Sequence, residues 1–294
     1  QTRALEQEQE GIAGEIRTTR AKIAVLEADI ATALADIREA EAAAKRGIRF
    51  YSMTNTGGVT WDFGVIPYEP FPYQWIKRYR AMQEAHEKWG LCGIMESHHF
   101  GFYPSFISKL SKMAFYEGCE HIEERLMEIL KGEFGEENAA AVDAALKLWS
   151  EGITHYIPSD ADQYGAFRVG PSYPFNMMQG WVACKLPAAS YSMFGNRIID
   201  PLYRARNDGR EAPASIRIHA EIESLKKMKA LMEEGLVILK SLQNPNDELS
   251  RLINMGEFIV RTLITGIHAK EWHHLNCALG YEREREKLEK VLDD

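Results

Sequence analysis

Two observations in the sequence predict a mainly helical protein with a small parallel β component. From residue 120 onward, apolar residues recur at intervals of three or four through several long stretches, which is the pattern of amphipathic helices. Before that point, two short apolar stretches alternate with two helical ones, and this order is typical of a parallel sheet. We therefore expect a long amphipathic helix or helical hairpin at residues 1–46, a βα segment at 47–117 and a helical domain at 118–294.

The N-terminal segment contains no proline and no aromatic residue up to position 46. Isoleucine recurs every seven residues from Ile16 to Ile37, which indicates the apolar seam of a heptad pattern. Such a helix could be a coiled-coil dimerisation arm, or it could pack its apolar stripe on the rest of the chain. Because only about four heptads are present, the second interpretation is favoured.

The βα segment contains two predicted strands, at residues 47–53 and 91–96, each followed by a loop rich in turn-forming or aromatic residues. A helix is predicted over 73–88, and Gly90 ends it. A second helix begins near Pro104, since proline suits the first helical turn. Strand, loop and helix therefore alternate twice.

The helical domain contains four predicted helices, at residues 120–131, 136–151, 216–242 and 245–279. The last two carry broad apolar faces and are joined by a short connection, which predicts an antiparallel helical hairpin. A long loop interrupts the domain at residues 156–213, and a loop of this length in a compact domain is usually functional.

Composition excludes several classes of function. With 35 basic and 43 acidic side chains the net charge is −8, so no general attraction to nucleic acid is expected. No apolar run reaches the roughly 18 to 20 residues that cross a bilayer, so no membrane partner is expected. Four cysteines without a CxxC pair argue against a zinc knuckle or a disulfide scaffold and favour the cytoplasm.

Motifs for nucleophilic hydrolysis and phosphate binding are also missing, because the sequence has no GxSxG, GxxxxGK[ST] or GxGxxG pattern. Glu96 with His98 and His99 could suggest a metal site. Adjacent residues at a strand end point in opposite directions, however, so the two histidines would not reach one ion together. The sequence therefore predicts neither a metal nor another cofactor.

Candidate site residues lie in the loops that follow the two predicted strands, because ligands of βα folds bind beyond the carboxyl ends of strands. Aromatic rings beside carboxylates and histidines suit a sugar, which offers apolar faces for stacking and hydroxyls for hydrogen bonds. The alternative is that the aromatic residues fill a core. A further arginine, in the long loop, could bind an anionic or hydroxyl group or pair with a carboxylate. The candidates are Trp61, Asp62, Tyr68, Glu69, Glu96, His98, His99, Tyr103 and Arg168.

Residues 61–78, 93–109 and 162–174 together resemble the carboxyl-terminal half of bacterial (β/α)₈ glycoside hydrolases of the β-N-acetylhexosaminidase-like kind. Residues 101–105, Gly-Phe-Tyr-Pro-Ser, match the helix start that follows a sugar-lining loop in that family. The resemblance covers about residues 47–279, by motif rather than by identity. It implies a partial (β/α)₈-barrel-like (TIM barrel) segment followed by a helical domain, with carbohydrate as the partner.

The sequence departs from this family in two ways. Residues 97–100, Ser-His-His-Phe, replace the tryptophan usual before the glycine of the last-strand loop, and the family's Asp-Glu catalytic pair would lie upstream of the residues present. The resemblance thus implies a fragment of a cytoplasmic hydrolase that contributes sugar-subsite residues, with Glu96 binding a substrate hydroxyl. The remaining strands would come from elsewhere or the fragment would close differently, and the expected partners are the missing upstream part of the same enzyme or further copies in a homo-oligomer. The alternative is a helical interaction or oligomerisation protein without catalytic activity.

Overall fold

The computed structural model shows a mostly helical chain with one two-stranded parallel sheet, as the sequence predicts. Most of the N-terminal helix predicted over 1–46 lies outside the residues that the structure describes. Within this segment, residues 38–45 are described and form a helix. The structure describes residues 19, 38–57, 66, 68–96, 104–157, 167, 170–172 and 213–281.

The sheet is built by a β-α-β unit. Strand β1 (Ser52–Met53) pairs in parallel with β2 (Ile94–Met95), with Ser52 opposite Ile94, and helix α2 (Pro72–Trp89) connects the two. Both strands are shorter than the predicted seven and six residues. Hydrogen bonds from Cys92 N to Phe50 O (3.0 Å) and from Thr54 N to Met95 O (3.0 Å) extend the pairing by one residue or two, but the chain before Phe50 has no described partner strand.

Helix α2 begins and ends within one residue of its predicted bounds. Pro72 occupies the first turn, where its missing N–H costs nothing. Gly90 ends the helix in the left-handed conformation at φ 72°, which glycine adopts without a steric penalty. The buried face carries Ile76, Tyr79 and Met82 at spacings of three residues, so one side of α2 packs into the core.

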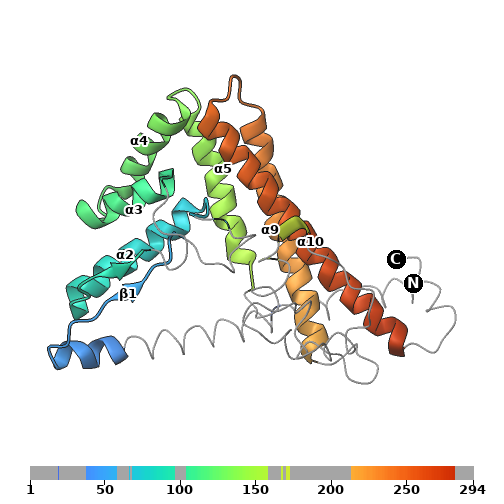
Figure 1. The fold of residues 1–294 in the computed structure, drawn as a ribbon, viewed down its shortest axis with the longest axis horizontal. Helices are drawn as coiled ribbons and strands as arrows, with labels where there is room; N and C mark the ends of the chain where they lie inside the picture. The colour runs from blue at the N-terminus through green and yellow to red at the C-terminus, as the bar shows by residue number, and fades with distance from the viewer. Residues whose placement is uncertain are drawn as a thin grey trace, which may run out of the picture.

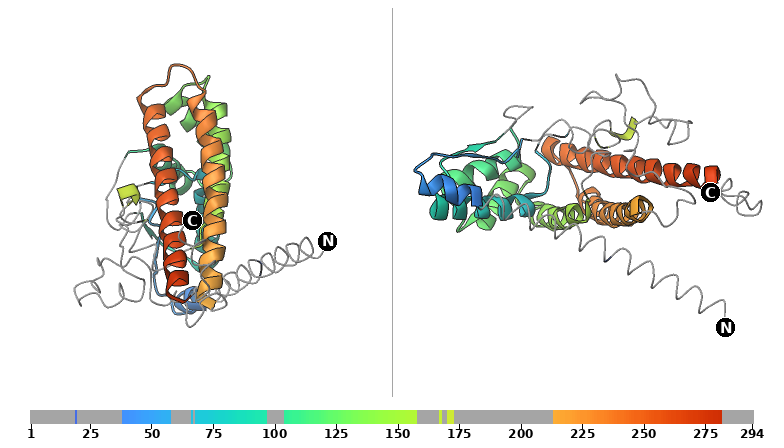
Figure 2. Two further views of the ribbon diagram at one scale, coloured as in Figure 1. Left: turned by 90° about the vertical axis from the view of Figure 1, so that its right-hand side faces the viewer. Right: turned by 90° about the horizontal axis from the view of Figure 1, so that it is seen from below.

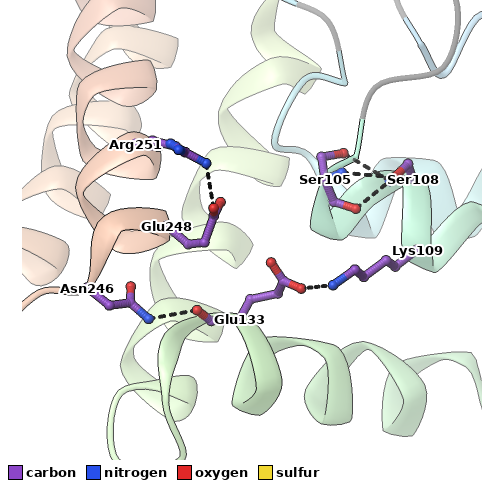
Figure 3. Close-up of polar contacts among 7 residues, drawn as sticks. All are labelled: Ser105, Ser108, Lys109, Glu133, Asn246, Glu248 and Arg251. Atoms are coloured by element: carbon purple, nitrogen blue, oxygen red, sulfur yellow. Dashed lines mark hydrogen bonds and ion pairs between the residues drawn. The ribbon is translucent and has the colours of Figure 1, made fainter.

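Helix α3 (Phe106–Tyr116) follows the second loop, and its start is fixed by a capping box. The Ser105 hydroxyl accepts from Ser108 N, and the Ser108 hydroxyl accepts from Ser105 N, at 3.1 and 2.9 Å (Figure 3). Helix α4 (Ile122–Phe134) lies next to it, and Lys109 forms an ion pair with Glu133 across the two helices (Figure 3).

The remaining long helices are α5 (Ala139–Gly152), α9 (Pro213–Lys240) and α10 (Asp247–Tyr281). Short 3₁₀ turns, η2 (Ile153–His155) and η3 (Gly170–Ser172), follow α5 and precede α9. Figure 1 shows α9 and α10 side by side, with α5 against α9 and with α2, α3 and α4 on the other side of α5. Helix α5 therefore joins the small helices and the sheet to the long pair.

The predicted antiparallel hairpin of α9 and α10 is confirmed (Figure 2). Lys240 near the end of α9 pairs with Glu257 of α10 at 2.6 Å, while Lys226, earlier in α9, pairs with Glu271, later in α10, at 2.9 Å. Asn246 caps α10 by accepting from Leu249 N at 2.8 Å, and its amide donates to Glu133 O at 2.8 Å (Figure 3). The turn of the hairpin is thereby tied to the end of α4.

A buried tryptophan locks α5 to this hairpin. Trp149 is fully buried, and its indole Nε1 donates to the main-chain oxygen of Met232 in α9 at 3.0 Å. The ring lies against two glycines, because a Cβ atom on Gly235 would stand 2.3 Å from Nε1 and one on Gly256 would stand 2.5 Å from the ring carbons. Three helices thus meet at one side chain.

Replacing either glycine by alanine tests this lock. Gly235→Ala should destabilise the protein by roughly 1–3 kcal/mol, because the added methyl group displaces the indole and breaks its hydrogen bond. Urea unfolding followed by circular dichroism measures the change. The matched control is Gly132→Ala in α4, where the new Cβ meets nothing within 4 Å and should stabilise by about 0.5–1 kcal/mol through helix propensity. Equal effects at the two positions would contradict the lock.

Leu263 of α10 provides a second test of the hairpin. It is fully buried, so Leu263→Ala should destabilise by roughly 2–5 kcal/mol by leaving a cavity. Lys240→Ala removes only a solvent-exposed ion pair with Glu257 and should change stability little. Both values come from the denaturant midpoint, and gel filtration runs alongside. An unchanged midpoint with loss of an oligomer would instead make this face intermolecular.

Candidate functional site

The carboxyl edge of the sheet holds the described part of the predicted site. Because β1 and β2 are parallel, the loops that follow them leave from the same edge. Pairing continues past the strands, since Gly57 N donates to Glu96 O at 3.1 Å. The first residues of both loops, from Thr54 and from Glu96, therefore lie next to each other.

Glu96 has one carboxylate oxygen with a hydrogen-bond partner among the described residues and one without. The Thr54 hydroxyl lies 3.2 Å from Glu96 Oε2 and 3.2 Å from the main-chain oxygen of Met95. Oxygen Oε1 is buried and has no hydrogen-bond partner among the described residues. A buried carboxylate oxygen without a donor costs free energy, so this atom calls for a donor from outside the described residues.

Asn55 supplies a second such acceptor at the same edge. Its Oδ1 atom is buried and likewise lacks a partner within the described part of the chain. The residue adopts the left-handed conformation at φ 51°, which asparagine tolerates better than most side chains. Sequence reasoning did not single out Asn55. The available signal was an asparagine at a strand end, before the turn residues Thr56 and Gly57.

Tyr79 of α2 lies under this edge. Its hydroxyl donates to Thr56 Oγ1 at 3.3 Å. Burial raises the pKa of the Tyr79 hydroxyl far above its ordinary value, and the charges of Glu96 and Tyr68 raise this pKa further. Tyr79 therefore stays a neutral hydrogen-bond donor at physiological pH.

Tyr68 anchors the end of the first loop in the core. It is only 1% exposed although its backbone is left-handed, with φ 56°, a conformation that costs a bulky residue about 1–3 kcal/mol. Burying the large ring offsets that cost. Glu69 follows it half-buried, and its main-chain oxygen accepts from Trp75 Nε1 at 3.1 Å. These contacts fasten the loop to the first turn of α2.

The structure thus brings Glu96 and Tyr68 to the same region around Tyr79, with Tyr68 packed into the core rather than lining an open surface. Glu69 lies next to Tyr68, and its own main-chain contacts face α2. The other candidates lie outside the described residues: Trp61, Asp62, His98, His99, Tyr103 and Arg168.

Within the described ranges, no group of three or more histidine, cysteine, aspartate or glutamate side chains is placed to hold a metal ion. None of the described helices combines the length and the apolarity needed to cross a membrane. No protein-family model, curated protein or solved structure matches this chain. The resemblance to hexosaminidase-like hydrolases therefore rests on the sequence motifs and stays a prediction.

Proposed function

We propose that this chain contributes a sugar-binding subsite of a glycoside hydrolase, with the catalytic carboxylate pair supplied from outside these residues. The observation that carries the proposal is the buried Oε1 atom of Glu96, an acceptor without a described donor at the carboxyl edge of a parallel sheet. Ligands of βα folds bind at this edge.

The chemistry of the edge favours a ligand rich in hydroxyl groups. Glu96 Oε1 and Asn55 Oδ1 can only accept, so a ligand that contacts either atom must donate a hydrogen bond to it. Neighbouring hydroxyls of a pyranose are such donors. A hydrogen bond to a charged carboxylate contributes about 1.5–3 kcal/mol, which is enough for specific recognition by a small site.

Aromatic residues in the loops that follow both strands support the same proposal, since sugar rings stack on them. The alternative, a helical interaction or oligomerisation protein, rests on the heptad pattern within residues 1–46 and on the apolar faces of the last two helices. Leu263 and Met228 on those faces are fully buried within one chain, so these positions are not available to a partner.

Substitution of Glu96 separates a binding role from a structural one. We expect the chain to bind N-acetylglucosamine or its β-linked disaccharide in calorimetric titrations, and Glu96→Gln to weaken that binding roughly tenfold or more. The same variant should unfold within about 1 kcal/mol of the parent, because removing a buried charge without a full set of donors costs little stability.

The control for this titration is Glu120→Gln, an exposed position that should change neither quantity. Unchanged sugar affinity in Glu96→Gln would refute the proposed subsite. A large loss of stability would show instead that Glu96 is structural.

A second prediction concerns turnover. The chain alone should not hydrolyse aryl β-glycosides, including the N-acetylglucosaminide, because both retaining and inverting hydrolases need two carboxylic groups at a defined separation. Release of the chromogenic aryl group measures the activity. Turnover that disappears in Glu96→Gln would place the catalytic pair inside these residues and contradict the prediction.

A further inference from the structure

A separate pocket opens at the opposite end of β2, away from Glu96. It has a volume of about 380 Å³, which is within the range of small-molecule sites. One wall is a single face of α2, a second is the segment that leads into β2, and the third is the end of α3. The lining residues are Tyr79, Met82, Gln83, His86, Glu87, Leu91, Cys92, Gly93, Ile94, Ala114, Phe115 and Gly118.

Several hydrogen-bond donors of this pocket are already bound to the protein. The Cys92 thiol donates to Phe50 O at 2.9 Å, and Gln83 Nε2 donates to Glu87 Oε1 at 3.1 Å. His86 Nδ1 lies 2.7 Å from Leu91 O, and because a carbonyl oxygen only accepts, this nitrogen carries the hydrogen. The Cys92 and His86 donors are therefore directed at the protein and not at a ligand, and one of the two N–H groups of Gln83 is bound to Glu87.

Acceptors remain in the same lining. With its hydrogen on Nδ1, the neutral His86 ring has a lone pair on Nε2. Glu87 has no lysine or arginine partner among the described residues, unlike Glu84 one turn earlier, which pairs with Lys88. No lysine or arginine lines the pocket. The pocket is thus negative in character and lacks the groups that would hold an anion.

The apolar part of the pocket suits an aromatic or branched hydrocarbon group. Met82 and Leu91 are buried beside it, and the rings of Tyr79 and Phe115 meet edge to face with centroids 5.5 Å apart. Phe115 is 42% exposed, so part of its ring is open to contact. Aromatic rings also attract cations placed over their faces.

We propose that this pocket binds an organic amine in its protonated form. The hydrocarbon body would lie against Met82 and Phe115, and the ammonium group would donate to the carboxylate of Glu87 and to His86 Nε2. Three N–H donors and a positive charge match a lining that offers acceptors and the carboxylate of Glu87, which accepts from Gln83 but has no lysine or arginine partner among the described residues. Glu96 does not line this pocket, so the proposal does not rest on the proposed sugar subsite, although Tyr79 borders both regions.

Cys92 gives a direct readout because it is exposed and lines the pocket. Methyl methanethiosulfonate, a neutral thiol reagent, is applied to the full chain, and peptide mass spectrometry follows its addition to Cys92. We expect 2-phenylethylammonium to slow this modification in a saturable manner at millimolar concentration. The anion of the same shape, 3-phenylpropanoate, should leave the rate unchanged.

Variants assign the protection to the carboxylate. Glu87→Gln should raise the amine concentration needed for half-protection roughly fivefold to tenfold, as loss of a charge-assisted contact predicts. The matched control, Glu84→Gln on the same helix, should behave like the parent because that side chain is outside the lining. Absence of protection by the amine, equal protection by the anion, or an unaltered Glu87→Gln variant would each overturn the proposal.

Discussion

The indole of Trp149 holds the helical structure together, because helices α5, α9 and α10 meet at this side chain. A glycine inside a helix costs about 1 kcal/mol relative to alanine, yet Gly235 and Gly256 stand where larger residues would overlap the ring. Burying a whole indole and satisfying its N–H on Met232 O offsets that cost. The two glycines are therefore part of the packing of Trp149 and not weak points of the hairpin.

Helix α5 also contacts the β-α-β unit and fixes its position relative to the hairpin. On another part of its surface, Asp143 accepts from the Tyr73 hydroxyl at 2.5 Å, and the Ser150 hydroxyl accepts from Tyr73 N at 3.2 Å. Burial and the bond to Asp143 raise the pKa of Tyr73, so its hydroxyl remains a donor. The start of α2 is thus fixed on α5, and two turns later α2 places Tyr79 under the Thr56 hydroxyl. The carboxyl edge of the sheet is positioned through this chain of contacts from the hairpin outward.

Local signals in the sequence predicted the helix ends well, while long-range contacts could not be predicted. Gly90 and Pro104 act within one helical turn, and the helices there end and begin near the predicted positions. The length of a strand depends on its partner strands. The two predicted strands of seven and six residues are therefore only two residues long each in the structure, and they pair with each other. Trp149 and Met232 are 83 positions apart, and no local pattern joins them. Glu96 was predicted because the edge at which parallel strands end follows from topology alone, whereas the burial of Asn55 Oδ1 and the left-handed backbone of Asn55 depend on the folded loop.

The two ends of β2 differ in how their acceptors are placed, and this difference separates the two proposed sites. At the carboxyl end, Glu96 Oε1 is buried without a described donor, a condition that costs roughly 1–3 kcal/mol until a donor arrives. A ligand that donates there recovers that free energy, so hydroxyl geometry should dominate recognition. At the amino end, Glu87 is exposed at the rim and keeps its hydration when the pocket is empty. Recognition there must come from charge and from burial of an apolar body against Met82 and Phe115, which is why a cationic amine, and not a neutral polyol, fits the second pocket.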